Sequence, residues 1–286
     1  MRRHRKFPEL SYANEQMPFW KRAFIRTVED LSGRNRLADL YDIWRTRSVG
    51  HSSSVMGDML ELIDVDVKIN GGQWPPKRLP DAPLVLIANH PYGIGDGIAI
   101  LALAEQVGRP FRVMINSELM KVPEIRPYSL PVSFEETREA TKMNLATKKE
   151  ALRLLDEGVT IVVFPAGGVA TAEKGFGRAF DLPWKNCVAR LVQSAEACVV
   201  PIFFEGQNGR MFHLASKIGL TARRSLLVRE FARLRGGTLS VHIGAPNSPG
   251  IVNAFTDRNA LMKYLQTAVF SLAPVPEDKP RLRIAA

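Results

Sequence analysis

The sequence has few of the residues that build disulfide scaffolds or metal sites. It contains two cysteines, Cys187 and Cys198, and no C-x-x-C pair. Two cysteines are too few for a disulfide framework, and they lack the spacing of a zinc site. No segment approaches the ~18 consecutive apolar residues of a membrane-spanning helix, and no signal-peptide core follows the basic start MRRHRKFPEL. We therefore expect a cytoplasmic protein that holds no metal.

Several nucleotide and nucleophile motifs are also missing. Residues 93–98, GIGDGI, lack the third glycine of the G-x-G-x-x-G dinucleotide fingerprint, and no P-loop occurs. No G-x-S-x-G elbow is present, so nothing supports a serine nucleophile of the α/β-hydrolase kind. These absences predict a protein without a tightly bound cofactor. Nucleic acid is not an expected partner, because the chain has no recognition motif and no interleaved aromatic and basic residues on a predicted sheet.

Positive charge is in excess. The chain has 39 Lys and Arg against 29 Asp and Glu, a net charge of +10. An anionic membrane or an acidic carrier protein would attract such a surface. Two basic segments, 17–31 and 216–237, also carry apolar residues at helical spacing. Each pattern is typical of a helix lying on a bilayer, or of a helix packed on the core with a solvated basic face. Residues 216–237 would also suit docking of an acidic carrier protein.

Short apolar runs alternate with helical segments from residue 84 onwards. This alternation predicts an α/β fold with a mostly parallel central sheet, helices on both faces and a basic helical element at the N-terminus. The expected divisions are a helical element over 1–70, an α/β domain over 71–272 and a mobile tail over 273–286. The expected strands cover 65–69, 84–88, 111–115, 159–164, 198–204 and 238–244, and the expected helices cover 17–31, 36–47, 52–63, 97–107, 144–158, 184–196 and 256–272.

The loop NHPYGIGDG, residues 89–97, follows the first expected strand of the α/β domain. Ligands in such sheets bind outside the carboxyl ends of the strands, which makes this loop the first place to look for chemistry. His90 and Asp96 would form a pair in which the carboxylate fixes the imidazole tautomer and the second ring nitrogen accepts a proton from a substrate hydroxyl. In the alternative, Asp96 caps the following helix and the glycines only permit a tight turn.

Taken with three later segments, this loop resembles the glycerol-phosphate and lysophospholipid acyltransferase superfamily. The superfamily places four residues between its histidine and aspartate, whereas five lie between His90 and Asp96. The form H-P-x-G-x-x-D-G is similar to that of a hemolysin-like or ornithine-lipid acyltransferase branch, and HPYGIGDG fits it at every position. The resemblance implies that His90 is the general base and Asp96 its orienting partner.

Three further blocks follow in the order that the superfamily has them. INSELMKVPEIRPYSLPV, residues 115–132, resembles a block with basic residues near the acceptor's anionic head, which points to Lys121 and Arg126. VVFPAGGVAT, residues 162–171, resembles the F-P-E-G block, with Ala166 in place of the usual glutamate. Backbone N–H groups of Gly167 and Gly168 would serve a phosphate or an oxyanion, or the pair forms only a flexible turn. VVPIFFEGQNGRMF, residues 199–212, resembles the fourth block, after which Arg210 is a further anion-binding candidate.

The resemblance implies an acyltransferase that acts on lipid at the inner membrane face. The donor would be an acyl thioester of coenzyme A or acyl carrier protein, used as a co-substrate, and the acceptor a lysophospholipid or lyso-ornithine lipid. Ala166 and the H-P-x-G-x-x-D-G form favour the hemolysin-like or ornithine-lipid branch. The extra residue before Asp96 and the missing carboxylate at 166 favour the alternative, a catalytically silent peripheral membrane-binding protein.

Overall fold

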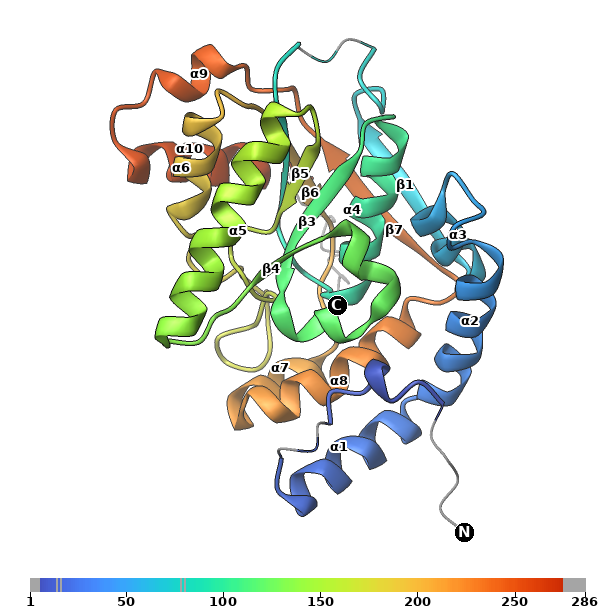
Figure 1. Ribbon diagram of the computed structural model, residues 1–286. Coiled ribbons are helices and arrows are strands. Elements are labelled where there is room, and N and C mark those ends of the chain that lie inside the picture. Colours follow the sequence, from blue (N-terminus) through green and yellow to red (C-terminus); the bar gives the residue numbers. More distant parts are fainter. Residues whose placement is uncertain (1–5, 14, 16, 78, 80, 275–286) are drawn as a thin grey trace, which may run out of the picture.

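A seven-stranded, mostly parallel sheet forms the centre of the protein in the computed structural model (Figure 1). The structure describes residues 6–13, 15, 17–77, 79 and 81–274. The strand order is β1-β7-β6-β2-β5-β3-β4, and the β6–β7 pair is antiparallel whereas the other pairs are parallel. The strands are β1 (Val65–Gly71), β2 (Leu84–Ala88), β3 (Phe111–Asn116), β4 (Ser129–Val132), β5 (Thr160–Val163), β6 (Cys198–Phe204) and β7 (Gly237–Ile243).

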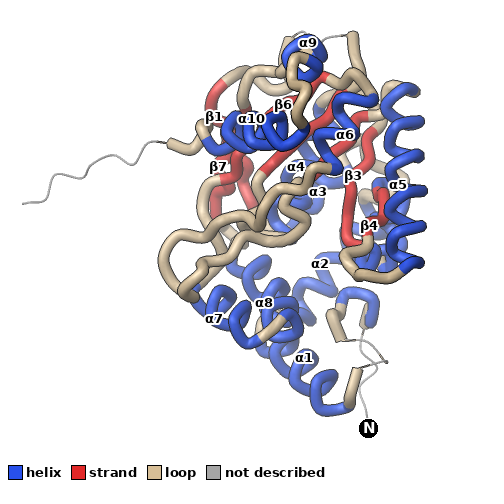
Figure 2. The backbone as a smooth tube through the Cα atoms, turned by 90° about the vertical axis from the view of Figure 1, so that its left-hand side faces the viewer, coloured by secondary structure: helices blue, strands red, loops and turns tan. Residues whose placement is uncertain are grey.

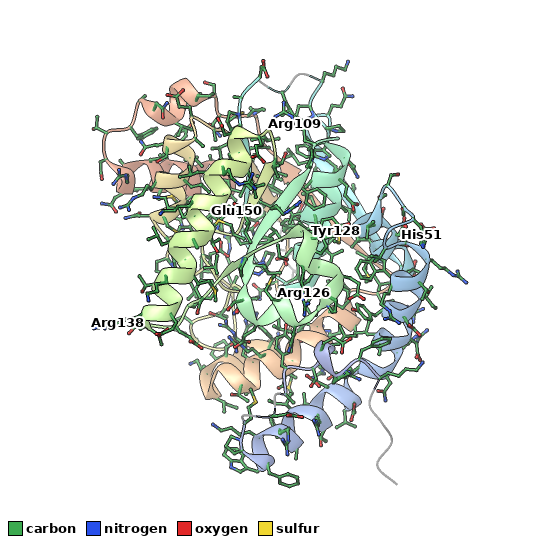
Figure 3. The ribbon with its side chains drawn as sticks, in the orientation of Figure 1. His51, Arg109, Arg126, Tyr128, Arg138 and Glu150 are labelled. Atoms are coloured by element: carbon green, nitrogen blue, oxygen red, sulfur yellow. The ribbon has the colours of Figure 1, made fainter. Side chains whose placement is uncertain are left out.

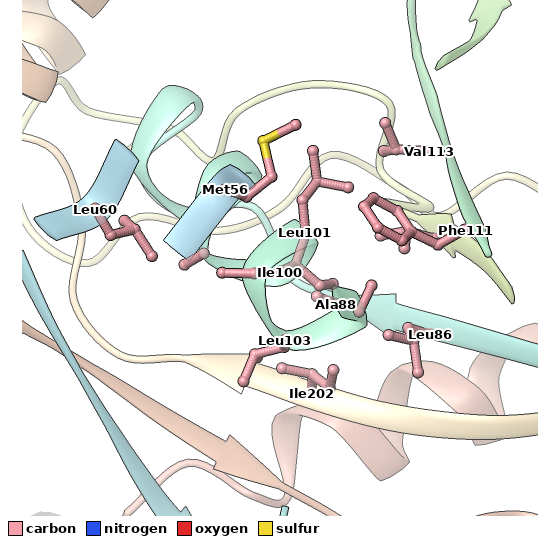
Figure 4. Close-up of a cluster of buried hydrophobic side chains, with 14 of the residues drawn as sticks. Met56, Leu60, Leu86, Ala88, Ile100, Leu101, Leu103, Phe111, Val113 and Ile202 are labelled. Carbon is pink, nitrogen blue, oxygen red and sulfur yellow. The ribbon is translucent and has the colours of Figure 1, made fainter. Parts of the chain in front are cut away.

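The central strands are apolar along their whole length because helices cover both faces of the sheet. Every residue of β2, β5 and β6 is buried. On one face the strands pack against α3 (Val55–Leu62) and α4 (Ile94–Gln106), as Figure 4 shows for Leu86, Ile100 and Ile202. On the other face they pack against α5 (Arg138–Asp156), α6 (Cys187–Ser194) and α10 (Arg258–Phe270). The predicted α/β fold is confirmed.

The remaining described helices gather mainly at one end of the molecule (Figures 1 and 2). There α8 (Leu220–Arg233) contacts both α1 (Phe19–Leu31) and α7 (Arg210–Ile218). The helix α2 (Arg34–Arg47) joins α1 to α3, and α9 (Pro249–Asn253) lies at the opposite end. Short 3₁₀ turns are η1 (Pro8–Leu10), η2 (Ser117–Lys121) and η3 (Pro123–Tyr128). None of the described helices is long and apolar enough to cross a membrane.

Several expected elements differ from the observed ones. The basic segment 216–237 contains the end of α7 and all of α8, which meet at Gly219, where φ is 151°. The apolar stripe of α8 is buried at Leu226 and Leu227, so α8 is packed on the protein, and contact of the segment with a bilayer stays a prediction. The strand β4 was not expected because it is only four residues long and contains Pro131, which an edge strand tolerates.

Other boundaries moved by a few residues. The helix α5 begins at Arg138, six residues before the expected start at 144, because Thr137 caps it by accepting from the Ala140 N–H at 3.1 Å. The strand β1 pairs with β7, so the expected boundary at 70/71 falls inside a strand of the central sheet. Of the expected tail over 273–286, residues 275–286 lie outside the described part of the chain.

Candidate active site

The loop between β2 and α4 brings His90 and Asp96 together. His90 follows β2 by two residues, and Asp96 is the third residue of α4. The Nδ1 atom of His90 lies 3.3 Å from Oδ2 of Asp96, whose side chain is fully buried, whereas 16% of the His90 side chain is exposed. This separation is longer than a well-formed hydrogen bond, and the buried Nδ1 makes no hydrogen bond to described residues. The carboxylate favours a proton on Nδ1, which leaves the lone pair on Nε2.

The carboxylate of Asp96 also holds the start of its helix. Its Oδ2 accepts from the Tyr92 N–H and its Oδ1 from the Gly97 N–H, each at 2.9 Å. The N-cap is Gly93, so the alternative in which Asp96 is the N-cap residue is wrong. A negative charge in the first turn is favoured by the helix dipole. Asp96 therefore stabilises the helix start and faces the imidazole at the same time.

Two glycines allow this close arrangement. The backbone of Gly93 has φ of 88°, and a Cβ there would lie 3.0 Å from side-chain atoms of Leu227 and Val169. A Cβ on Gly95 would lie 2.2 Å from Leu234. The first turn of α4 thus sits directly against α8, and the positive φ at Gly93 turns the chain into the helix within this short loop.

Three neighbouring segments hold His90 in place. Its backbone N–H donates to Oδ1 of Asp181 at 3.2 Å, and its carbonyl accepts from the Ala170 N–H at 2.8 Å. Its ring stacks on Phe164, with the centroids 4.0 Å apart. Asp181 also accepts from the Trp184 indole N–H at 3.0 Å, and burial raises the pKa of its carboxyl group. The histidine is fixed through both its backbone and its ring.

The preceding residue ties the loop to the neighbouring strand. The side-chain amide of Asn89 donates to the carbonyl of Phe204 at 2.9 Å and its oxygen accepts from the Phe204 N–H at 2.7 Å. Both bonds are buried, and together they join the ends of β2 and β6. At the next turn, Gly206 has φ of 96°, and a Cβ there would lie 1.9 Å from the Tyr92 hydroxyl. The loops after β2 and β6 are therefore packed as one unit.

The turn after β5 lies against the same histidine. Gly167 has φ of 67°, and its N–H donates to the carbonyl of Phe164 at 3.0 Å, so this donor is used within the turn. The N–H of Gly168 makes no hydrogen bond to any residue that the structure describes. Ala166 is buried. Of the two expected backbone donors, Gly168 is the one available to a substrate oxygen.

The three cations expected to bind an anion have different surroundings. Lys121 is largely enclosed, donates to the carbonyl of Ser11 and lies 5.3 Å from the ring centroid of Tyr12, and burial lowers its pKa. Arg126, on η3 (Figure 3), donates through Nε to the carbonyl of Met120 at 2.6 Å. Arg210 is exposed at the first position of α7. Lys121 and Arg126 are thus engaged with backbone carbonyls, and Arg210 faces solvent.

Two cations that the motifs did not indicate flank the turn after β5. A Cβ on Gly167 would lie 3.6 Å from Cε of Lys185, and a Cβ on Gly168 would lie 3.7 Å from Nη2 of Arg223. Neither cation forms an ion pair with a carboxylate in the described chain. Burial and the neighbouring Arg224 lower the pKa of Arg223. The turn therefore has a cation without a carboxylate partner on each side, and Nζ of Lys185 lies 4.8 Å from the ring centroid of Phe134.

The other described histidines lie outside this arrangement. His213 is buried, accepts from the Ala172 N–H at 3.3 Å, and has a pKa lowered by burial. His242 contacts the carboxylate of Glu205 through Nε2. His51 is exposed near the junction of α2 and α3 (Figure 3). No group of three or more His, Cys, Asp or Glu side chains in the described regions is placed to hold a metal ion.

Comparison with known proteins gives one positive result. A family model described as an acyltransferase matches residues 76–228, which is more than half of the chain. The match spans His90, Asp96, the turn at 165–168 and Arg223. No curated protein sequence matches the chain significantly.

Proposed function

This chain belongs to an acyltransferase family, and from that premise we propose that it moves a fatty acyl group from a thioester to a lipid hydroxyl. The acceptor is a lysophospholipid or a lyso-ornithine-type lipid, and the work is done at an anionic inner membrane face. The observation that supports this proposal most directly is the 3.3 Å approach of Asp96 Oδ2 to His90 Nδ1 at the carboxyl end of β2.

In the proposed mechanism His90 is the general base. Its Nε2 takes the proton of the acceptor hydroxyl while that oxygen attacks the thioester carbonyl carbon. The tetrahedral intermediate then collapses, the carbon–sulfur bond breaks, and the leaving thiolate takes the proton back from the imidazolium. Asp96 keeps the proton of Nδ1 in place and stabilises the imidazolium that forms, without becoming protonated itself. No covalent enzyme intermediate is needed.

The turn after β5 supplies the polar groups around the reacting carbonyl. The unused N–H of Gly168 is proposed to stabilise the oxyanion of the tetrahedral intermediate. Lys185 and Arg223, on either side of this turn, are proposed to bind an anionic group of the acceptor. Lys121, Arg126 and Arg210 stay predictions for the same task. Lys121 and Arg126 already donate to backbone carbonyls, and Arg210 faces solvent.

The donor and the branch of the family follow from the sequence resemblance. Acyl-ACP or acyl-CoA enters as a co-substrate, and the excess of cations on the chain supports binding of either acidic donor. The H-P-x-G-x-x-D-G form and Ala166 support the hemolysin-like or ornithine-lipid branch. The finer assignment between lysophospholipid and lyso-ornithine lipid is left to the acceptor assay.

The test is acyl transfer by the purified protein and two single variants. Labelled acyl thioesters are offered with liposomes that carry a panel of lyso-acceptors, including lyso-ornithine lipid. We expect transfer to one acceptor class and a loss of about a thousandfold or more in His90→Ala. His51→Ala, a histidine remote from the site, is the matched control and should keep full activity. Liposome binding without transfer to any acceptor would instead support the catalytically silent membrane-binding protein.

A further inference from the structure

Five large apolar side chains are exposed on two neighbouring segments beside the site. They are Phe176 (64% exposed), Phe180 (59%), Met211 (54%), Leu214 (48%) and Ile218 (83%). Two come from the hairpin 171–180, which is closed by the bridge between Thr171 and Phe180, and three come from α7. We call these five side chains the apolar rim. Clustered exposed apolar groups of this size on a soluble surface mark an interaction site.

The helix α7 has apolar residues on two adjacent faces, one buried and one exposed. Phe212 and Ala215 are buried against the protein. Met211, Leu214 and Ile218 follow the spacing i, i+3, i+7, so they share a second face, and that face points outward. The inner face is sufficient to hold the helix on α8. Of this outer stripe, Leu214 also lies against the hairpin at Gly175, whereas Met211 and Ile218 remain largely open to solvent.

The hairpin and α7 form one continuous surface. A Cβ on Gly175 would lie 2.9 Å from Cδ2 of Leu214 and 3.6 Å from side-chain atoms of Lys217. The Ala172 N–H donates to Nδ1 of the buried His213 on α7. The backbone views agree, since the loop that precedes α6 runs down to α7 in Figures 1 and 2. The hairpin is thus seated on the helix.

The charges around the apolar rim are mostly positive. The segments 171–185 and 210–218 contain two carboxylates, Glu173 and Asp181, and the second of these is held against the His90 backbone. Their cations are Lys174, Arg178, Lys185, Arg210 and Lys217. A second copy of this surface would be repelled by its own charge, whereas an anionic lipid surface would be attracted. Together with the exposed apolar side chains, this charge favours an anionic lipid surface over a second copy of the chain as the occupant.

The same hairpin leads directly into the candidate active site. Asp181, one residue beyond the bridge at Phe180, accepts the backbone N–H of His90, and Ala170, one residue before the bridge, donates to the His90 carbonyl. A lipid surface in contact with the apolar rim would therefore lie next to the histidine. The α1 side chains Phe19, Trp20 and Phe24 are exposed at this end of the molecule too.

We infer that the apolar rim inserts into an anionic lipid surface and sets the site against it, an inference that rests on the proposed function only for the identity of the substrate. The binding itself requires no catalysis. Apolar side chains enter the interface between headgroups and acyl chains, and the surrounding lysines and arginines contact anionic headgroups.

The test is sedimentation of the purified full chain with vesicles of neutral phosphatidylcholine or of a mixture with anionic phosphatidylglycerol. We expect binding to the mixed vesicles, weakened by high salt. The variant Phe176→Ser/Ile218→Ser should reduce the partition coefficient by about tenfold or more, because two apolar side chains no longer enter lipid. Ile251→Ser is the matched control, since Ile251 is 42% exposed on α9 at the far end of the molecule.

Activity on a water-soluble, short-chain acceptor separates the two proposals. If Phe176→Ser/Ile218→Ser keeps activity on the soluble acceptor but loses vesicle binding, the proposed acyl transfer and the lipid-binding surface are both supported. If no variant or wild-type protein transfers an acyl group but vesicle binding falls in the rim variant, the proposed function fails and the surface assignment holds. Equal vesicle binding by the rim variant and the Ile251 variant, or a change of oligomeric state in the rim variant alone, would overturn the inference.

Discussion

The loop of His90 and the turn beside Arg223 lie side by side, and they are built in opposite ways. Around His90, the described chain supplies partners for the backbone N–H, the carbonyl and the ring face, and the Asp96 carboxylate lies 3.3 Å from Nδ1. Around the turn at 167–168, two cations and one backbone N–H have no acidic or carbonyl partner. The first region is preorganised for proton transfer, which needs fixed geometry. The second region has two cations and a backbone N–H that are free to bind an anionic ligand.

Of the substitutions that test this comparison, loss of the charge at Asp96 should lower activity the most. In Asp96→Asn the side chain keeps its shape, but the amide offers no carboxylate to the imidazole, so the tautomer with a free Nε2 lone pair is no longer favoured. We expect acyl transfer to fall by about a hundredfold to ten-thousandfold, by analogy with other histidine–aspartate pairs. The measurement is kcat/KM for the acceptor identified in the liposome assay.

The matched control for Asp96→Asn is Asp58→Asn, a carboxylate in the first turn of α3 that has no contact with the site. It should keep full activity. Thermal unfolding of both variants separates loss of chemistry from loss of fold, because Asp96 also accepts two backbone N–H groups. Retention of more than a tenth of the activity by a folded Asp96→Asn variant would mean that His90 does not depend on this carboxylate.

Arg223→Gln addresses the second region and should have a smaller effect. The substitution removes the charge beside Gly168 but keeps a polar side chain on α8. We expect the apparent KM for an anionic acceptor to rise by about tenfold, the value of one charge-assisted contact, while kcat changes little. Arg224→Gln is the control, since Arg224 donates to Glu118 at 2.6 Å and already has a partner.

The acceptor charge sharpens the Arg223 test further. A neutral acceptor of the same chain length should show no difference between the wild-type protein and Arg223→Gln. If the variant instead lowers kcat for both acceptors equally, Arg223 supports the fold of the site and does not bind the acceptor. Lys185→Gln should give the same pattern with a smaller rise in KM, because Lys185 is an exposed side chain.

The two regions could not be predicted equally well from the sequence. The strands β2 and β6 could be predicted because they are continuous apolar runs, and His90 and Asp96 could be paired from the motif HPYGIGDG. Arg223 could not be placed, because its relation to the site depends on which side of α8 packs on Gly93. That side is set by Leu227, one helical turn further on, and no local pattern reports it.

The sequence also could not predict a break between two elements where the same hydrophobic pattern continues across the break. The basic and apolar residues of 216–237 keep helical spacing through Gly219, yet the chain turns there and α8 is buried between α1 and α7. The short strand β4 contains a proline, which argues against a strand until its position at the sheet edge is known. In both cases the secondary structure depends on tertiary packing, which local residue preferences do not determine.

Asp181 gives the smallest expected effect. It holds the backbone of His90 from the base of the hairpin, next to Phe180. Burial raises the pKa of this carboxyl group above its ordinary value near 4. The folded state therefore binds the proton more tightly than the unfolded state, and the stability that this gives is present below the unfolded pKa and is lost as pH rises through the folded pKa. The wild-type protein should thus lose stability relative to Asp181→Asn as pH rises from about 4 through the raised pKa of Asp181.

The measurement is the melting temperature of both proteins by calorimetry at several pH values in this window. The difference in melting temperature between the two proteins should move steadily in favour of Asp181→Asn as pH rises. The substitution also changes the hydrogen bonds to His90 and Trp184, which adds a constant offset. The trend with pH, not the value at pH 4, is therefore the test. Glu173→Gln removes an exposed carboxylate from the same hairpin and is the control for the loss of a hairpin charge as such. A shift in favour of the wild-type protein would mean that hydrogen bonds from the His90 and Trp184 N–H groups lower the pKa of Asp181 more than burial raises it. The carboxyl group would then be ionised beside the histidine.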